Sequence, residues 1–167
     1  MPRFLYVVAR NRRDLLEQLR AEIANQQDVA VIMDRRSGAP LLVQGSGIAW
    51  YGAAPEMPEL ERSLRAFIRK NAALFLARDE ELVLDPVSSG PLGDGGARQV
   101  VFTRAIDGVP VIGDRYLFHF GHGRLFAFGA TRWTPFAVST HPAIDREDAL
   151  AQLRRYLALG AGVSAAI

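Results

Sequence analysis

The sequence predicts an α+β protein: an antiparallel β-sheet of about four strands packed on one long helix, with an N-terminal β-α-β unit and a C-terminal helix. Two patterns predict this fold class. Apolar residues recur at helical spacing across residues 60–75, and arginines occupy the other side of the same helical wheel. Between residues 82 and 128, short apolar runs are separated by glycine-containing turns, as in a series of hairpins. Because the helix needs a sheet face on which to bury its apolar stripe, we expect the two to pack together.

Residues 1–40 are predicted to form a β-α-β unit. Apolar runs at 4–8 and 28–33 predict two strands, and an asparagine after the first of them can cap a helix. That helix has one apolar stripe, formed by Leu15, Leu16, Leu19 and Ile23. The unit either makes a satellite layer or extends the main sheet, since a crossover of this length permits parallel pairing. The polar turn at 34–40 contains glycine and proline, and it predicts the boundary with a domain spanning 41–167.

The other elements follow in order along that second domain. Besides the helix at 60–75, strands are predicted at 41–43, 82–84, 99–105, 116–120 and 125–128. Gly121 and Gly123 can take the positive φ that the turn of the last hairpin requires. The C-terminal helix is predicted to begin at Asp145, which is a capping residue with Asp148 three positions later. The apolar face of this helix consists of Leu150, Leu153, Tyr156 and Leu157.

Composition indicates a globular protein and disfavours several classes of partner. The chain has 167 residues, 49% of them hydrophobic, which is enough to bury a core. It contains no cysteine, so disulfides and thiolate metal sites are excluded. Twenty basic and eighteen acidic residues leave a formal charge of +2, too small to indicate a nucleic-acid partner. No apolar run reaches the roughly 20 residues that cross a bilayer, and we recognise no signal peptide in this chain, so we expect no membrane partner.

No catalytic or metal-binding pattern is evident, so we expect a protein that is not an enzyme and has no catalytic residues, cofactor or metal. The histidines are His119, His122 and His141. His119 and His122 are spaced i, i+3, but they fall in a predicted hairpin where their side chains need not converge. Neither is followed by Glu, so the H-E-x-x-H motif of zinc peptidases is absent. The segment 88–90 does not match a nucleophile elbow, and the glycine-rich segment 90–96 lacks the lysine of a phosphate loop.

Aromatic residues gather in the last predicted hairpin: Tyr116, Phe118, Phe120, Phe126 and Phe128. Such a set could form a base-stacking platform on a sheet that binds RNA. We favour a core role, because the helix at 60–75 requires an apolar sheet face. The opposite face, with Arg115, His119 and Arg124, is then the one that can meet a partner.

Several spaced segments resemble one known family. Residues 67–75 (FIRKNAALF) end the helix, Val101–Arg104 lies in a strand, and Gly108–Gly113 (GVPVIG) follows it. The next hairpin has a glycine turn, and residues 140–150 (THPAIDREDAL) lead into the last helix. Taken in this order over residues 40–158, these segments resemble the fungalysin/thermolysin propeptide (FTP) domain, followed by the start of a PepSY-like helix.

The resemblance implies a binding role. Domains of this family inhibit zinc metallopeptidases and act as their intramolecular chaperones, so it implies a non-catalytic module whose partner is a metallopeptidase domain, in cis or in trans. It also implies a secreted or periplasmic location. The residues expected to meet the partner are Val109, Pro110, Val111, Asp114, Arg115, His119 and Arg124. The alternative is a stand-alone protein- or ligand-binding module unrelated to proteolysis, for which a homodimer through an exposed sheet edge is one option.

Overall fold

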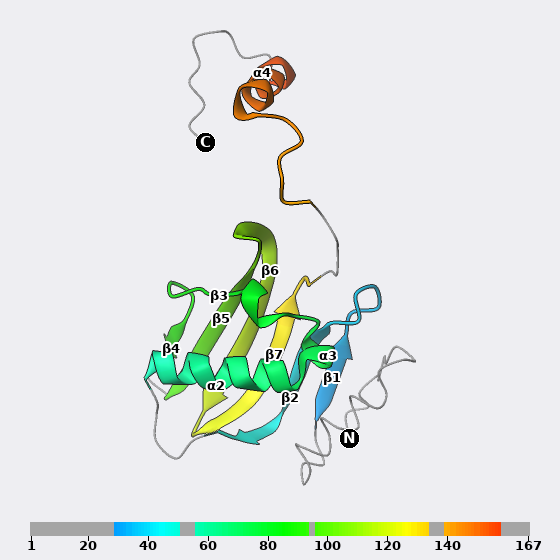
Figure 1. Ribbon diagram of the computed structural model, residues 1–167. Helices are drawn as coiled ribbons and strands as arrows, with labels where there is room; N and C mark the ends of the chain where they lie inside the picture. The colour runs from blue at the N-terminus through cyan, green and yellow to red at the C-terminus, as the bar shows by residue number, and fades with distance from the viewer. Residues whose placement is uncertain (1–28, 51–55, 94–95, 134–138, 158–167) are drawn as a thin grey trace. The chain divides into compact units, whose positions relative to one another are not determined.

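The computed structural model describes residues 29–50, 56–93, 96–133 and 139–157 (Figure 1). These residues fall into two compact units that divide near residue 136, and each unit is described on its own. The first unit contains the sheet and the helices that precede residue 82. The second contains one helix, α4 (Arg146–Tyr156).

The strands of the described residues form one seven-stranded sheet in which every pairing is antiparallel. The order is β1-β2-β7-β6-β5-β3, and β4 pairs with β5 as well. The strands are β1 (Ala30–Met33), β2 (Pro40–Ala49), β3 (Leu82–Leu84), β4 (Gly90–Leu92), β5 (Ala97–Ile106), β6 (Val109–Gly121) and β7 (Arg124–Thr131). β5 and β6, which are neighbours in this order, form a long hairpin (Figure 1).

The main helix, α2 (Met57–Lys70), lies across one face of the sheet (Figure 1). A proline stands in its first turn, where a missing N–H costs nothing, and basic residues fill its last turn, where they favour the helix dipole. Leu60, Leu64 and Ile68 form its apolar stripe and are fully buried. The helix ends at Asn71, whose side-chain amide donates a hydrogen bond of 2.9 Å to the Phe67 carbonyl.

A short helix, α3 (Ala72–Phe75), follows at once and ends at Leu76, which has the left-handed φ of +53°. Two aromatic side chains from the rest of the unit satisfy carbonyls at this helix end. The Tyr116 hydroxyl on β6 donates to the Phe75 carbonyl, and Trp133 Nε1 donates to the Leu76 carbonyl at 2.9 Å. The end of α3 is therefore fixed both to the middle of the sheet and to the residue that follows β7.

Aromatic side chains fill the space between the helices and the sheet. Tyr116, Phe118 and Phe120 alternate along β6 and are buried, and Phe118 stacks on Phe128 of β7 with ring centroids 5.9 Å apart. Phe75 of α3 contacts the same group from the helix layer. The predicted core role is confirmed for these four sheet aromatics. Phe126 differs, because it is only half-buried and its ring lies 6.2 Å from that of His119.

The predicted packing of about four strands on one long helix is wrong, although the α+β class is correct. The described residues form seven strands and three short α-helices, because the helix predicted at 60–75 is divided at Asn71. β2 continues past two glycines, Gly45 and Gly47, and β4 contains both Gly and Pro, so these stretches lack the composition of a typical strand. These segments are strands because long neighbouring strands supply their hydrogen-bonding partners.

The predicted N-terminal unit is only partly within the described residues. β1 pairs with β2 and so extends the main sheet. The strand and helix predicted before it lie in residues 1–28, outside the described residues, so the division at residue 40 stays a prediction.

In the second unit, the Asp145 side chain accepts a hydrogen bond of 2.8 Å from the Asp148 N–H, which confirms the predicted helix cap. No residue of α4 is buried, and Tyr156 is 87% exposed. Among the helices of the described residues, none is both long and apolar enough to cross a membrane.

Candidate functional site

The β5–β6 hairpin carries a large bulge close to its turn. Thr103 pairs with Arg115, but the next residue of β5 pairs with Val111, so Ile112, Gly113 and Asp114 have no opposite residue on β5. Bulges of this kind bend a strand and redirect its side chains. Here Ile112 is 87% exposed while Asp114 is buried. We call residues 106–114 the hairpin end.

Two features fix the backbone of the hairpin end. Asp107 and Gly108 both have positive φ, as a two-residue turn with the twist of a hairpin requires. Gly113 has φ +91°, and the Arg132 guanidinium lies over it, so close that an added Cβ would meet Nη1 at 3.2 Å. Arg132 itself has a left-handed φ of +53°, which is strained for a residue with a side chain. Strained positions of this kind persist only where the surrounding structure holds them in place.

Three buried charged residues, Glu81, Arg104 and Asp114, support the hairpin end from within; we call them the buried ion cluster. Arg104 Nε lies 2.9 Å from Glu81 Oε2, and Arg104 Nη1 lies 3.2 Å from Asp114 Oδ2. The guanidinium also stacks over the Trp133 ring, 4.8 Å from its centroid. Buried charges require partners of this quality, because removal from water is costly for each of them. The cluster therefore fixes the last residue of the bulge to β5 and to the segment before β3.

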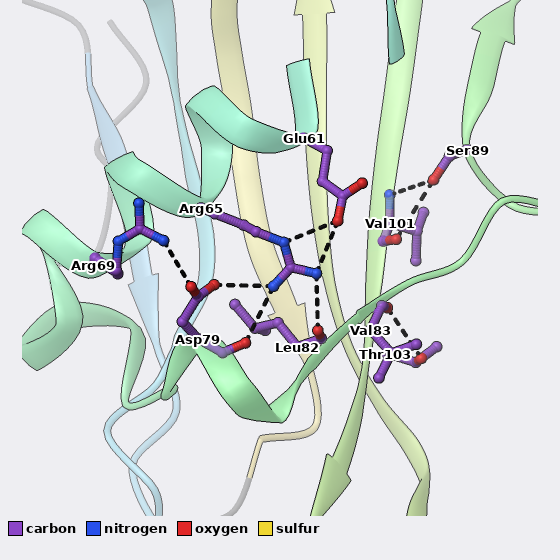
Figure 2. Close-up of polar contacts among 9 residues, drawn as sticks. All are labelled: Glu61, Arg65, Arg69, Asp79, Leu82, Val83, Ser89, Val101 and Thr103. Carbon is purple, nitrogen blue, oxygen red and sulfur yellow. Dashed lines mark hydrogen bonds and ion pairs between the residues drawn. The ribbon is translucent and has the colours of Figure 1, made fainter. Parts of the chain in front are cut away.

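That segment is the 3-10 helix η2 (Asp79–Glu81), and arginines of α2 hold it in place (Figure 2). Arg65 Nη1 donates to Asp79 Oδ1 at 2.9 Å, and its Nη2 donates to the Leu82 carbonyl at 3.0 Å. Arg69 Nη1 binds the other oxygen of Asp79 at 2.6 Å. Partial burial of Asp79 opposes ionisation, but the hydrogen bonds from both arginines outweigh it and lower the pKa of this carboxyl below its ordinary value.

A second set of polar contacts in Figure 2 closes the edge of β5. β3 and β4 pair with different stretches of this edge and leave Val100 and Val101 between them. The Ser89 hydroxyl accepts a hydrogen bond of 2.9 Å from the Val101 N–H, and the Asp85 N–H donates to the Val101 carbonyl at 2.9 Å. A side chain and a loop thus supply hydrogen-bonding partners between the two short strands, so this edge of β5 is covered from residue 97 to residue 104.

The structure places only some of the predicted partner-binding residues at the hairpin end. Val109 and Pro110 are exposed there, and Val111 is half-buried. Asp114 is buried in the ion cluster, so its carboxylate holds the bulge and is not displayed on the surface. Arg115 is exposed and lies next to the hairpin end, opposite Thr131 of β7.

The other two predicted residues lie further along the sheet. His119 is half-buried on β6, and this burial lowers the pKa of its imidazole below the ordinary value. Arg124 pairs with Gly121 at the opposite end of β6, where its guanidinium donates to the carbonyls of Ser46 and Gly47. The predicted set therefore does not form one continuous surface.

Sequence reasoning missed the most exposed large hydrophobic residue of the hairpin end, Ile112, and the cluster that supports it. One signal could have revealed the cluster. Along β5, Val100, Phe102 and Arg104 share a face by strand alternation, and the first two are core residues. A charged residue at a core-facing position predicts a buried ion pair. Ile112 gave no comparable signal, because its exposure depends on the bulge.

Within the described ranges, no group of three or more His, Asp or Glu side chains is arranged to hold a metal ion. Comparison of the chain with protein-family models, with curated proteins and with solved structures finds no match. The resemblance to the FTP and PepSY families therefore stays a prediction from the sequence.

Proposed function

We propose that this chain is a non-catalytic, propeptide-like module that binds a zinc metallopeptidase domain, inhibits it and assists its folding. The observation that carries the proposal is the hairpin end. An exposed aliphatic residue, Ile112, and its exposed neighbours Val109 and Pro110 stand on a backbone fixed by the buried ion cluster. A surface fixed before binding loses little conformational entropy when a partner docks, which favours tight association.

The first test measures inhibition. The purified chain is added at increasing concentration to mature thermolysin and to two other thermolysin-like peptidases, and hydrolysis of a short chromogenic peptide is recorded. We expect the rate to fall with a saturable dependence on the chain. Because any unfolded protein competes as a substrate, gel electrophoresis must show that the chain remains intact during the assay. Neither inhibition nor binding with any of the three enzymes would refute the inhibitor role.

The chaperone role has its own test. A denatured thermolysin-like catalytic domain is diluted into buffer with and without the chain, and recovered activity is measured after the two proteins are separated. We expect a higher recovered fraction with the chain than with an equal concentration of albumin. Equal recovery in the two samples would refute the chaperone role, and the inhibitor role would then depend on the inhibition assay alone.

A second candidate is a stand-alone module that binds another protein or itself. The observation that favours it is the exposed apolar face of α4, where Leu153, Tyr156 and Leu157 are 38%, 87% and 50% exposed. Light scattering over a hundredfold concentration range separates the two candidates. A propeptide-like module remains monomeric until its enzyme is added, whereas a self-associating module gains mass as its concentration rises.

A further inference from the structure

Ile112 differs from the other exposed aliphatic side chains in the way its position is fixed. Single exposed apolar residues are normal on protein surfaces and carry no meaning by themselves. Val87, for example, is 94% exposed, but it lies in a loop held by the Asp85 side chain, which accepts from the Val87 and Ser88 N–H groups. Ile112 instead lies on a three-residue bulge of a central strand.

The bulge is maintained by two costly features. Gly113 and Arg132 both have left-handed φ values, and the second of these is strained. Asp114 is a buried carboxylate that requires the Arg104 guanidinium. A regular hairpin would need neither feature, and Ile112 would then pair with a residue of β5. The bulge places Ile112 outside the regular pairing of β5 and β6, where its side chain is 87% exposed.

The charges next to Ile112 indicate the chemistry of its partner. Arg132 lies over Gly113, and Arg115 begins the regular stretch of β6 just after the bulge. Both arginines are exposed, and among the described residues neither has a carboxylate within ion-pair distance, although the pKa of the Asp85 carboxyl is lowered by hydrogen bonds from Ser88 and also by the nearby Arg115. Asp114, the nearest carboxylate in sequence, is already bound to Arg104. The surface around Ile112 therefore combines an exposed aliphatic side chain with two exposed guanidinium groups beside it.

We infer that Ile112 is the anchor through which this chain binds the metallopeptidase domain, and that it enters an apolar pocket whose rim carries carboxylates facing Arg115 and Arg132. This inference rests on the proposed function and adds the chemistry of the contact. Central apolar anchors supply most of the energy of a protein interface, whereas charges at the rim mainly steer the encounter. The two parts of the inference can therefore be separated by experiment.

The anchor is tested with three variants against a thermolysin-like peptidase that the wild-type chain binds, with affinity measured by biolayer interferometry. Ile112→Asp should raise Kd by about 10- to 100-fold, which is the range of a binding hot spot. Ile112→Leu should keep Kd within about threefold, since the pocket still receives an aliphatic side chain. Val87→Asp is the matched control, an equally exposed aliphatic residue on a different loop, and should leave Kd unchanged. Melting temperatures should agree among all variants, because both sites are exposed.

The carboxylate rim is tested with Arg132→Asn, which removes the charge and suits the left-handed backbone at this position. This variant should slow association and weaken its dependence on salt concentration, with little effect on dissociation.

The outcomes separate the inference from the proposed function. If the wild-type chain binds no peptidase, the proposed function fails, and the anchor fails with it. If the wild-type chain binds and Ile112→Asp binds equally well, the anchor alone is refuted. If Ile112→Asp is weakened but Arg132→Asn shows the wild-type salt dependence, the acidic rim is refuted.

Discussion

Replacing Arg104 by Met tests whether the buried ion cluster stabilises the fold at the hairpin end. Removing one partner from a buried ion pair costs about 3–5 kcal/mol, because the remaining charge is left without compensation. Glu81 would keep Arg78, whose Nε lies 2.6 Å from its other oxygen, so Asp114 is the carboxylate that loses its partner. We therefore expect a loss at the lower end of that range, about 3 kcal/mol. The Met side chain retains packing against Trp133 and so limits the cavity.

Urea denaturation followed by far-ultraviolet circular dichroism measures this loss. For a protein of this size, a loss of about 3 kcal/mol corresponds to a fall in Tm of roughly 6–12 °C. Arg69→Met is the matched control, because Arg69 is 54% exposed and its ion pair with Asp79 lies at the surface. A pair of that kind contributes below about 1 kcal/mol. If the two variants lost the same free energy of unfolding, burial would not be what makes the Arg104 ion pairs more stabilising than the surface pair.

Three further predictions concern the sheet and its titrating groups. Gly129→Ala should destabilise the fold by about 1–3 kcal/mol or more, because the new Cβ would lie 2.1 Å from the Leu41 carbonyl oxygen. Gly121→Ala should cost less in the same urea titration, because its Cβ would meet only two Phe126 ring carbons, at 3.3 and 3.5 Å. Burial lowers the pKa of His119, so the stability of the protein should decrease as the pH drops through the ordinary imidazole value of about 6.5. In thermal melts between pH 7.5 and 5, Tm should decrease less for His119→Gln than for wild type, and equal decreases would show that His119 is not responsible. The pKa of Asp79 is lowered despite its partial burial, because Arg65 and Arg69 donate to it; its ionised form therefore contributes fully to stability above the ordinary pKa of about 3.9, and this contribution is lost as the pH falls below that value. Asp79→Asn should be less stable than wild type at pH 6 and should lose less stability than wild type on acidification to pH 3.

The parts of the fold that could be predicted from sequence are those with strong periodicity. Leu60, Leu64 and Ile68 mark the buried stripe of α2, and the alternating aromatics of β6 mark the sheet face that receives it. Both patterns are local, since each depends only on the spacing within one element. The sequence also located the cap of α4 at Asp145, because a capping residue acts within a single turn.

The missed elements depend on partners distant in the sequence. Gly90–Leu92 has the composition of a loop and becomes β4 only because β5 offers a free stretch of edge. The GVPVIGD segment contains a turn, a strand and a bulge, and no local pattern shows where one ends and the next begins. Ile112 was missed for the same reason, since its outward position is set by the register between β5 and β6.

The two hydrogen bonds at the end of α3 have a consequence for how the first unit assembles. The residues they join, Phe75 with Tyr116 and Leu76 with Trp133, are 41 and 57 positions apart. Contacts between such distant positions form late, because a long loop must close before they are gained. The carbonyls at the end of α3 thus gain their donors only after most of the sheet has formed. This couples the helices and the sheet in one cooperative folding transition. A shortened version of the protein that stops at the last strand would leave the Leu76 carbonyl without its donor, so any expressed fragment of this unit should extend at least to Trp133.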